Sequence, residues 1–106
     1  MSVQHLFDEV SARLVRDDPR VEQAHMFNSV GLRTGGKFFA AVSRDRLLVK
    51  LPARRVAELV SSGTGEPFHS GGRLMKEWVL LGPADETACD AYVTEALGFV
   101  GAKSGS

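Results

Sequence analysis

The sequence predicts an α+β fold in two layers, in which an antiparallel sheet is covered by helices on one face. Two observations carry this prediction. Apolar residues recur at spacings of three and four near both ends of the chain and after Pro52, which is the period of amphipathic helices. Residues 21–51 are instead rich in β-branched and aromatic residues and are broken by turn-forming pairs, as in antiparallel strands. The expected order is helix, three strands, helix, two strands, helix.

The first half of the chain is expected to carry one helix and three strands. The apolar spacing predicts a helix over residues 3–16, which Pro19 ends. Residues 21–34 are typical of a strand with a bend near Asn28 and Ser29, because two turn-forming residues interrupt an apolar run there. Two further strands are expected over residues 37–43 and 46–51.

The second half is expected to begin with a helix. Pro52 suits the first position of this helix, which ends at Gly63. Four glycines and a proline then predict a loop over residues 63–73, with a short strand at 67–69. The remaining elements are a strand over residues 74–81, a helix over 84–100 and a flexible tail over 101–106. Residues 1–100 are therefore expected to form a single domain.

Composition limits the classes of function. A chain of 106 residues supports one hydrophobic core. Its 13 basic and 13 acidic residues cancel, so no overall field draws it to nucleic acid or to an anionic membrane. Cys89 is the only cysteine, which excludes an intramolecular disulfide and a zinc site made of several thiolates. No segment approaches the ~20 apolar residues of a membrane span, so we expect no membrane association and a cytoplasmic location.

Three segments carry a resemblance to a known family. They are "MFNSVGLRTGGKFFAAV", "LLVKLPARRVAELVSSGTGEPF" and "MKEWVLL", followed by a final helix. In this order of landmarks, over about residues 20–100, the chain resembles the TfoX N-terminal domain family, which is related in fold to YjbR-like proteins. The resemblance implies the order of elements given above, in a stand-alone domain without the TfoX C-terminal domain. It implies no catalytic residues. His25 and Asn28-Ser29 differ from the common pattern of the family.

The Gly35-Gly36-Lys37 motif superficially resembles a phosphate loop. Such a loop needs a further glycine upstream, a Ser or Thr after the lysine and a helix behind it, whereas Phe38 and a strand follow here. Gly35 and Gly36 between two apolar runs are typical of a hairpin turn with positive φ angles, so we interpret the pair as a structural turn.

The other reactive residue types form no recognisable catalytic or metal-binding pattern. His5, His25 and His69 lie far apart without metal-ligand spacing, and we expect no metal and no cofactor. Cys89 lies on the apolar stripe of the last helix and is interpreted as a small buried hydrophobe. We therefore expect that the protein is not an enzyme.

A basic segment over residues 33–55 is the one charge feature above background. It holds seven basic residues against a single acid, Asp45. The favoured interpretation is that these charges protect turns and strand edges. The alternative is an anion or nucleic-acid surface, because Lys50 precedes a helix with two arginines in its first turn, so that Lys50, Arg54 and Arg55 could converge on one spot. The residues of that candidate surface are Lys50, Arg54, Arg55, Arg46 and Arg44.

The glycine-rich stretch has aromatic neighbours that suggest a second candidate site. Phe68, His69 and Trp78 are the candidates for a ligand pocket there. For Trp78 the favoured interpretation is the centre of the core, because a small domain usually buries its tryptophan. Apolar residues on both faces of strand 74–81 also suggest a homodimer through the sheet or its edge.

Three functions follow as hypotheses. The leading one is a non-catalytic interaction or regulatory domain that binds an unidentified protein partner. The second is a nucleic-acid-binding module that uses the basic segment 33–55. The third is a small ligand-binding protein or enzyme with a pocket at residues 63–78.

Overall fold

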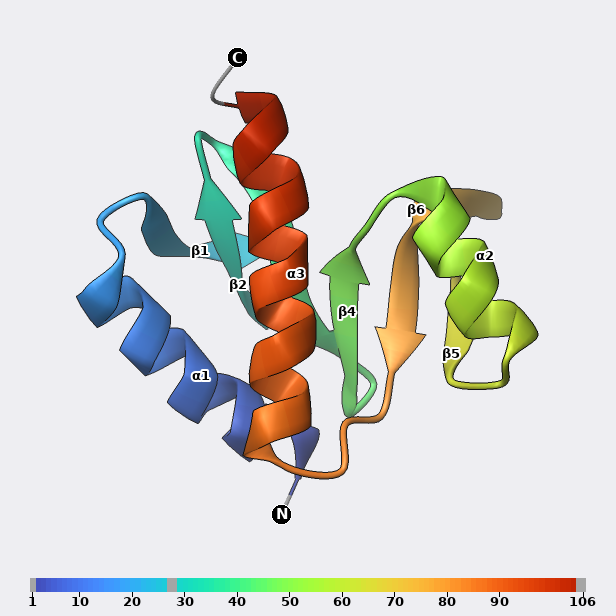
Figure 1. Cartoon of the computed structure of the whole chain (residues 1–106), viewed down its shortest axis with the longest axis horizontal. Coiled ribbons are helices and arrows are strands. Elements are labelled where there is room, and N and C mark those ends of the chain that lie inside the picture. The colour runs from blue at the N-terminus through green and yellow to red at the C-terminus, as the bar shows by residue number, and fades with distance from the viewer. Residues whose placement is uncertain (1, 27–28, 105–106) are drawn as a thin grey trace.

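The computed structural model describes residues 2–26 and 29–104, which form one antiparallel sheet with three helices on one face (Figure 1). This arrangement confirms the predicted α+β fold class. The elements are α1 (Val3–Asp17), β1 (Val21–Met26), β2 (Ser29–Thr34), β3 (Lys37–Ser43), β4 (Arg46–Lys50), α2 (Ala53–Ser61), β5 (Gly65–Ser70), β6 (Arg73–Leu81) and α3 (Glu86–Ser104).

The strand order across the sheet is β1-β2-β3-β4-β6-β5, and every neighbouring pair is antiparallel. The single interrupted strand expected over residues 21–34 is in fact two strands. Met26 pairs with Ser29, so β1 and β2 form a hairpin across the position where a bend was expected. Residues 27 and 28, and with them the departure of Asn28 from the family pattern, lie outside the described residues.

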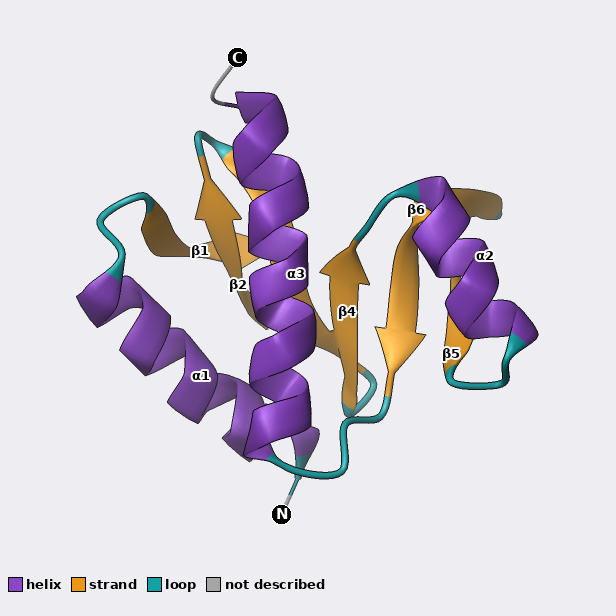
Figure 2. Ribbon diagram, viewed as in Figure 1, coloured by secondary structure: helices purple, strands orange, loops and turns teal. Residues whose placement is uncertain are grey.

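Three hairpins of the sheet share one turn geometry, with positive φ at both central residues. Gly35 and Gly36 have φ values of 59° and 79°, which confirms the predicted structural turn. Gly71 and Gly72 repeat it at 59° and 80°, so the loop expected over residues 63–73 contains the whole of β5 and its turn to β6 (Figure 2). The third turn, between β3 and β4, has the same geometry without glycine.

One hydrophobic core lies between the sheet and the helices. The central strands form one side of the core and α1 and α3 form the other, while α2 packs on β5 and β6. Cys89 on α3 is completely buried in this core, as predicted. The last helix continues to Ser104, so residues 101–104, which were expected to belong to a flexible tail, are helical. None of the described helices has the length and apolar character needed to cross a bilayer.

The start of β5 depends on a residue without a side chain. A Cβ atom on Gly65 would lie 2.6 Å from Cγ2 of Val79 and 3.2 Å from Cδ2 of Leu81. It would also lie 3.4 Å from Cβ of Leu59 on α2. Gly65 therefore lets α2, β5 and β6 approach one another closely.

We expect Gly65→Ala to lower the free energy of unfolding by about 1–3 kcal/mol, because the added methyl group overpacks this junction. Urea unfolding followed by circular dichroism measures the change. Gly98→Ala is the matched control: nothing lies within 4 Å of a Cβ atom there, and Gly98 is inside α3. That variant should gain about 0.5–1 kcal/mol from helix propensity. Equal effects of the two variants would contradict the packing described here.

Candidate functional site

The strand β6 pairs in regular register with one neighbouring strand, β4, and with a shifted register with the other, β5. It pairs regularly with β4 over four positions, from Leu47 with Leu81 to Lys50 with Trp78. Against β5, the partners change from Pro67 with Val79 to His69 with Leu74. Between these two pairs β5 advances by two residues and β6 by five, so β6 carries three extra residues there. Such a bulge bends the strand and redirects its side chains, and bulges are common beside functional sites.

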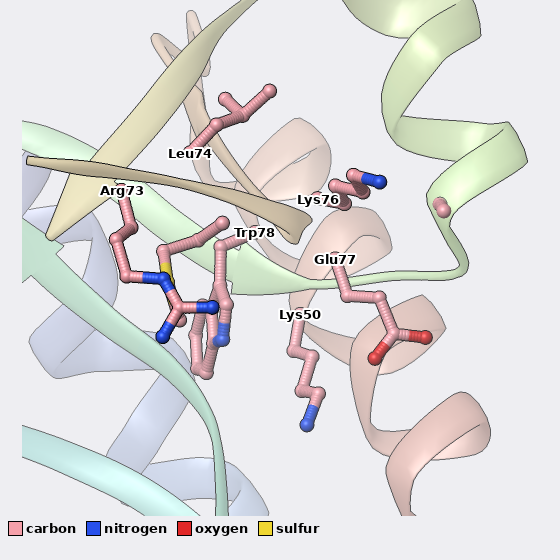
Figure 3. Close-up of a pocket in the computed structure, with 8 residues that line it drawn as sticks. Lys50, Arg73, Leu74, Lys76, Glu77 and Trp78 are labelled. Atoms are coloured by element: carbon pink, nitrogen blue, oxygen red, sulfur yellow. The ribbon is translucent and has the colours of Figure 1, made fainter.

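The bulged part of β6 borders an open hollow of about 520 Å³, which we call the basic hollow. Figure 3 shows Trp78 between Arg73 and Lys50, with Lys76 directed toward α2. Nζ of Lys50 lies 6.0 Å from the centre of the Trp78 ring, within the range of a cation–π interaction. The lining residues are Lys50, Ala53, Arg73, Leu74, Met75, Lys76, Glu77 and Trp78.

The basic hollow carries more positive than negative charge. Three cations, those of Lys50, Arg73 and Lys76, line it together with one carboxylate, that of Glu77. The arrangement therefore favours an anionic group next to an aromatic ring.

A second hollow, which we call the apolar groove, adjoins the first. It has a volume of about 340 Å³ and lies between α2 and the β5–β6 hairpin. Leu74 is the most exposed of the described large hydrophobic residues, at 52%. The lining residues are Ala53, Val56, Ala57, Val60, Pro67, Leu74, Met75 and Lys76. Four of them, Ala53, Leu74, Met75 and Lys76, also line the basic hollow, so the two form one continuous surface.

The structure does not bring the five predicted basic residues together. Lys50 lies in the basic hollow, while Arg54 is exposed on the first turn of α2. Arg46 begins β4, about 13 Å from Lys50 at the usual rise of a strand, and Arg44 lies in the turn before it. Arg46 is also paired with Glu66, at 2.8 Å between Nη1 and Oε1.

Arg55 is held by a distant helix. Its Nε donates to Oε2 of Glu95 on α3 at 2.9 Å, and this hydrogen bond raises the pKa of Arg55 above its ordinary value. The pair links α2 to α3, so Arg55 has a structural partner. The candidate anion surface predicted from the sequence is thus divided among several places.

The predicted pocket residues are also separated. Phe68 and His69 line a third hollow of about 280 Å³, beside Arg44 and Glu66. The favoured interpretation of Trp78 as the centre of the core is wrong: its side chain is half-buried and lies outside the core cluster. The reason is the alternation of side chains along a strand. Val79 points toward the core, so its neighbour Trp78 points to the opposite face of the sheet, beside the bulge.

Sequence reasoning missed Arg73 and Lys76 altogether. Both are exposed residues of β6 that the regular alternation of a strand would place on different faces. The available signal was a pair of basic residues around Leu74 and Met75, directly after a Gly-Gly turn. Their place in the lining of the same hollow as Lys50 depends on the register of β6, which no local pattern encodes.

Comparison with known protein families, curated proteins and solved structures gives no match for this chain. The resemblance to the TfoX N-terminal domain family stays a prediction from the sequence. Within residues 2–26 and 29–104, no three His, Cys, Asp or Glu side chains form a group that could hold a metal ion.

The charge of the basic hollow can be measured through Trp78, the only tryptophan of the chain. We expect iodide to quench its fluorescence more strongly than caesium does, because Lys50 and Arg73 on either side of the ring (Figure 3) concentrate anions around it. Lys50→Glu combined with Arg73→Glu should reverse this order, whereas Arg16→Glu on α1 should leave it unchanged. Emission that neither ion quenches would place Trp78 in the core and contradict the site.

The thiol of Cys89 should be unreactive in the folded protein. Burial raises the pKa of Cys89 to about 11, so little thiolate forms near neutral pH. We expect a disulfide reagent such as DTNB to label it at pH 8 only as fast as the chain unfolds, and rapidly in urea. Rapid labelling of the folded protein would show that the last helix leaves the thiol accessible.

Proposed function

We propose that this chain is a non-catalytic interaction domain that binds a protein partner through the apolar groove and the basic hollow. The observation that carries the proposal is the joining of the two hollows through Ala53, Leu74, Met75 and Lys76. Exposed apolar surface with a polar rim is typical of protein-binding sites. The resemblance to the TfoX N-terminal domain suggests that such binding serves regulation.

The nucleic-acid alternative receives less support from the geometry. Arg46 and Arg55 of the proposed nucleic-acid surface are engaged with Glu66 and Glu95. A surface for a phosphate backbone needs several cations that can each release a counterion. The homodimer hypothesis is compatible with the groove, in which case the partner is a second copy of the chain.

Leu74→Glu should abolish capture of the partner, because it places a charge in the middle of the apolar groove. The measurement is affinity capture from the native cell with quantitative mass spectrometry, comparing wild type with the variant. Val15→Glu is the matched control, since Val15 is a similarly exposed apolar residue (37%) on α1, away from the groove. We expect Val15→Glu to retain the partner.

A second variant guards against misfolding of the first. Ala57→Arg fills the groove from α2 with a residue that forms helices well, and it should lose the same partner. Thermal unfolding checks that each variant folds. A partner that wild type, Leu74→Glu and Ala57→Arg retain equally would contradict the proposed surface, and binding of duplex DNA that weakens steeply with salt would favour the nucleic-acid alternative.

A further inference from the structure

Resting on the proposed function, we infer that the partner binds by a short peptide segment whose apolar side chains fill the apolar groove and whose carboxylates reach the basic hollow. The groove and the hollow meet along Leu74, Met75 and Lys76 of the bulged strand. One segment can therefore occupy both.

The acidic end of the segment follows from the charges of the basic hollow. Arg73 and Lys76 come from β6 and Lys50 from the end of β4, so cations of two strands line one hollow. Glu77 is the single carboxylate among the lining residues. An Asp or Glu of the partner would add the missing negative charge, whereas a Lys or Arg there would meet like charge.

The small apolar side chains that α2 presents to the groove indicate that this part of the segment is apolar. Ala53, Ala57 and Val60 lie at helical spacing along the groove and bring little side-chain volume, so another chain can approach the helix closely. Leu74 forms the opposite wall, and Figure 3 shows it directed away from Arg73 and Lys50. Apolar side chains of the partner would sit between these walls and cover Leu74.

The openness of the groove favours a peptide over a fatty acid or another small amphiphile. A small-molecule site commonly buries 70–90% of its ligand in a concave pocket. Ala53, Ala57, Pro67 and Leu74 are all exposed, so the groove is a shallow channel open along its length. A peptide that lies along a surface needs no enclosure.

The size of the groove sets the length and strength of the contact. The nine residues of α2 extend about 13 Å, which roughly four extended residues span. A contact of this size belongs with the small, transient interfaces that bury less than about 1,200 Å². We therefore expect moderate affinity that falls as salt concentration rises.

The test begins with a library of random peptides of about 12 residues displayed on phage, three times the length that the groove spans. The whole chain is the bait, and binders of Leu74→Glu are removed. We expect the enriched peptides to combine two or more apolar residues with Asp or Glu toward one end. Enrichment of peptides without acidic residues, or no enrichment at all, would overturn the inference.

The second stage measures binding of the most enriched peptide through the fluorescence of Trp78. Replacing its acidic residues by Lys should weaken binding at least about 10-fold. Lys50→Glu combined with Arg73→Glu should weaken the acidic peptide similarly and should restore binding of the Lys peptide, while Arg16→Glu changes neither. Indifference to these charge reversals would overturn the inference. So would tighter binding of laurate or of duplex DNA, because each would name a different class of ligand.

The two proposals fail in different ways. If the groove variants lose the native partner but the selected peptides show no preference for acidic residues, the interaction domain stands and the peptide chemistry is wrong. If the acidic peptides bind as expected but Leu74→Glu still captures the native partner, the peptide site stands and the proposed function of this surface is wrong.

Discussion

The mismatch of register between β6 and its two neighbours is the constraint on which the candidate site depends. Buried backbone groups must find hydrogen-bond partners, and β6 meets this demand on one side by pairing in step with β4 up to Trp78. The three extra residues are then taken up on the β5 side. Side chains of the bulged segment consequently leave the regular alternation of a strand, and Arg73 and Lys76 line the same hollow as Lys50.

The helix α2 joins this irregular region to the core. Leu59 is buried in the core cluster, whereas Ala53 and Ala57 on the same helix are exposed and line the groove. Gly65 allows the helix to lie close to β6, and the ion pair of Arg55 with Glu95 fixes it to α3. The wall of the groove is thus part of a packed scaffold, which lowers the entropy cost of binding a partner there.

Local sequence patterns predicted the parts of the fold that local physics decides. The helical period, the hairpin at Gly35 and Gly36 and the burial of Cys89 each depend on neighbouring residues, and the structure confirms them. The site was beyond such reasoning. The extra residues in β6 become apparent only when its pairing with β5 is known. The hydrogen-bond partner of Arg55, Glu95, lies 40 positions away in the sequence. Trp78 was misplaced because its size indicates a core, whereas its position opposite Lys50 at the bulge leaves it partly exposed.

We propose that the bulged strand and α2 together form the binding surface of this protein. Amide chemical-shift mapping tests it most directly, with the isotopically labelled full chain titrated with its captured partner. We expect the largest shifts on residues 53–60 and 73–78, including the indole N–H of Trp78. Shifts concentrated on α1 or on the edge strand β1, with β6 unchanged, would contradict it.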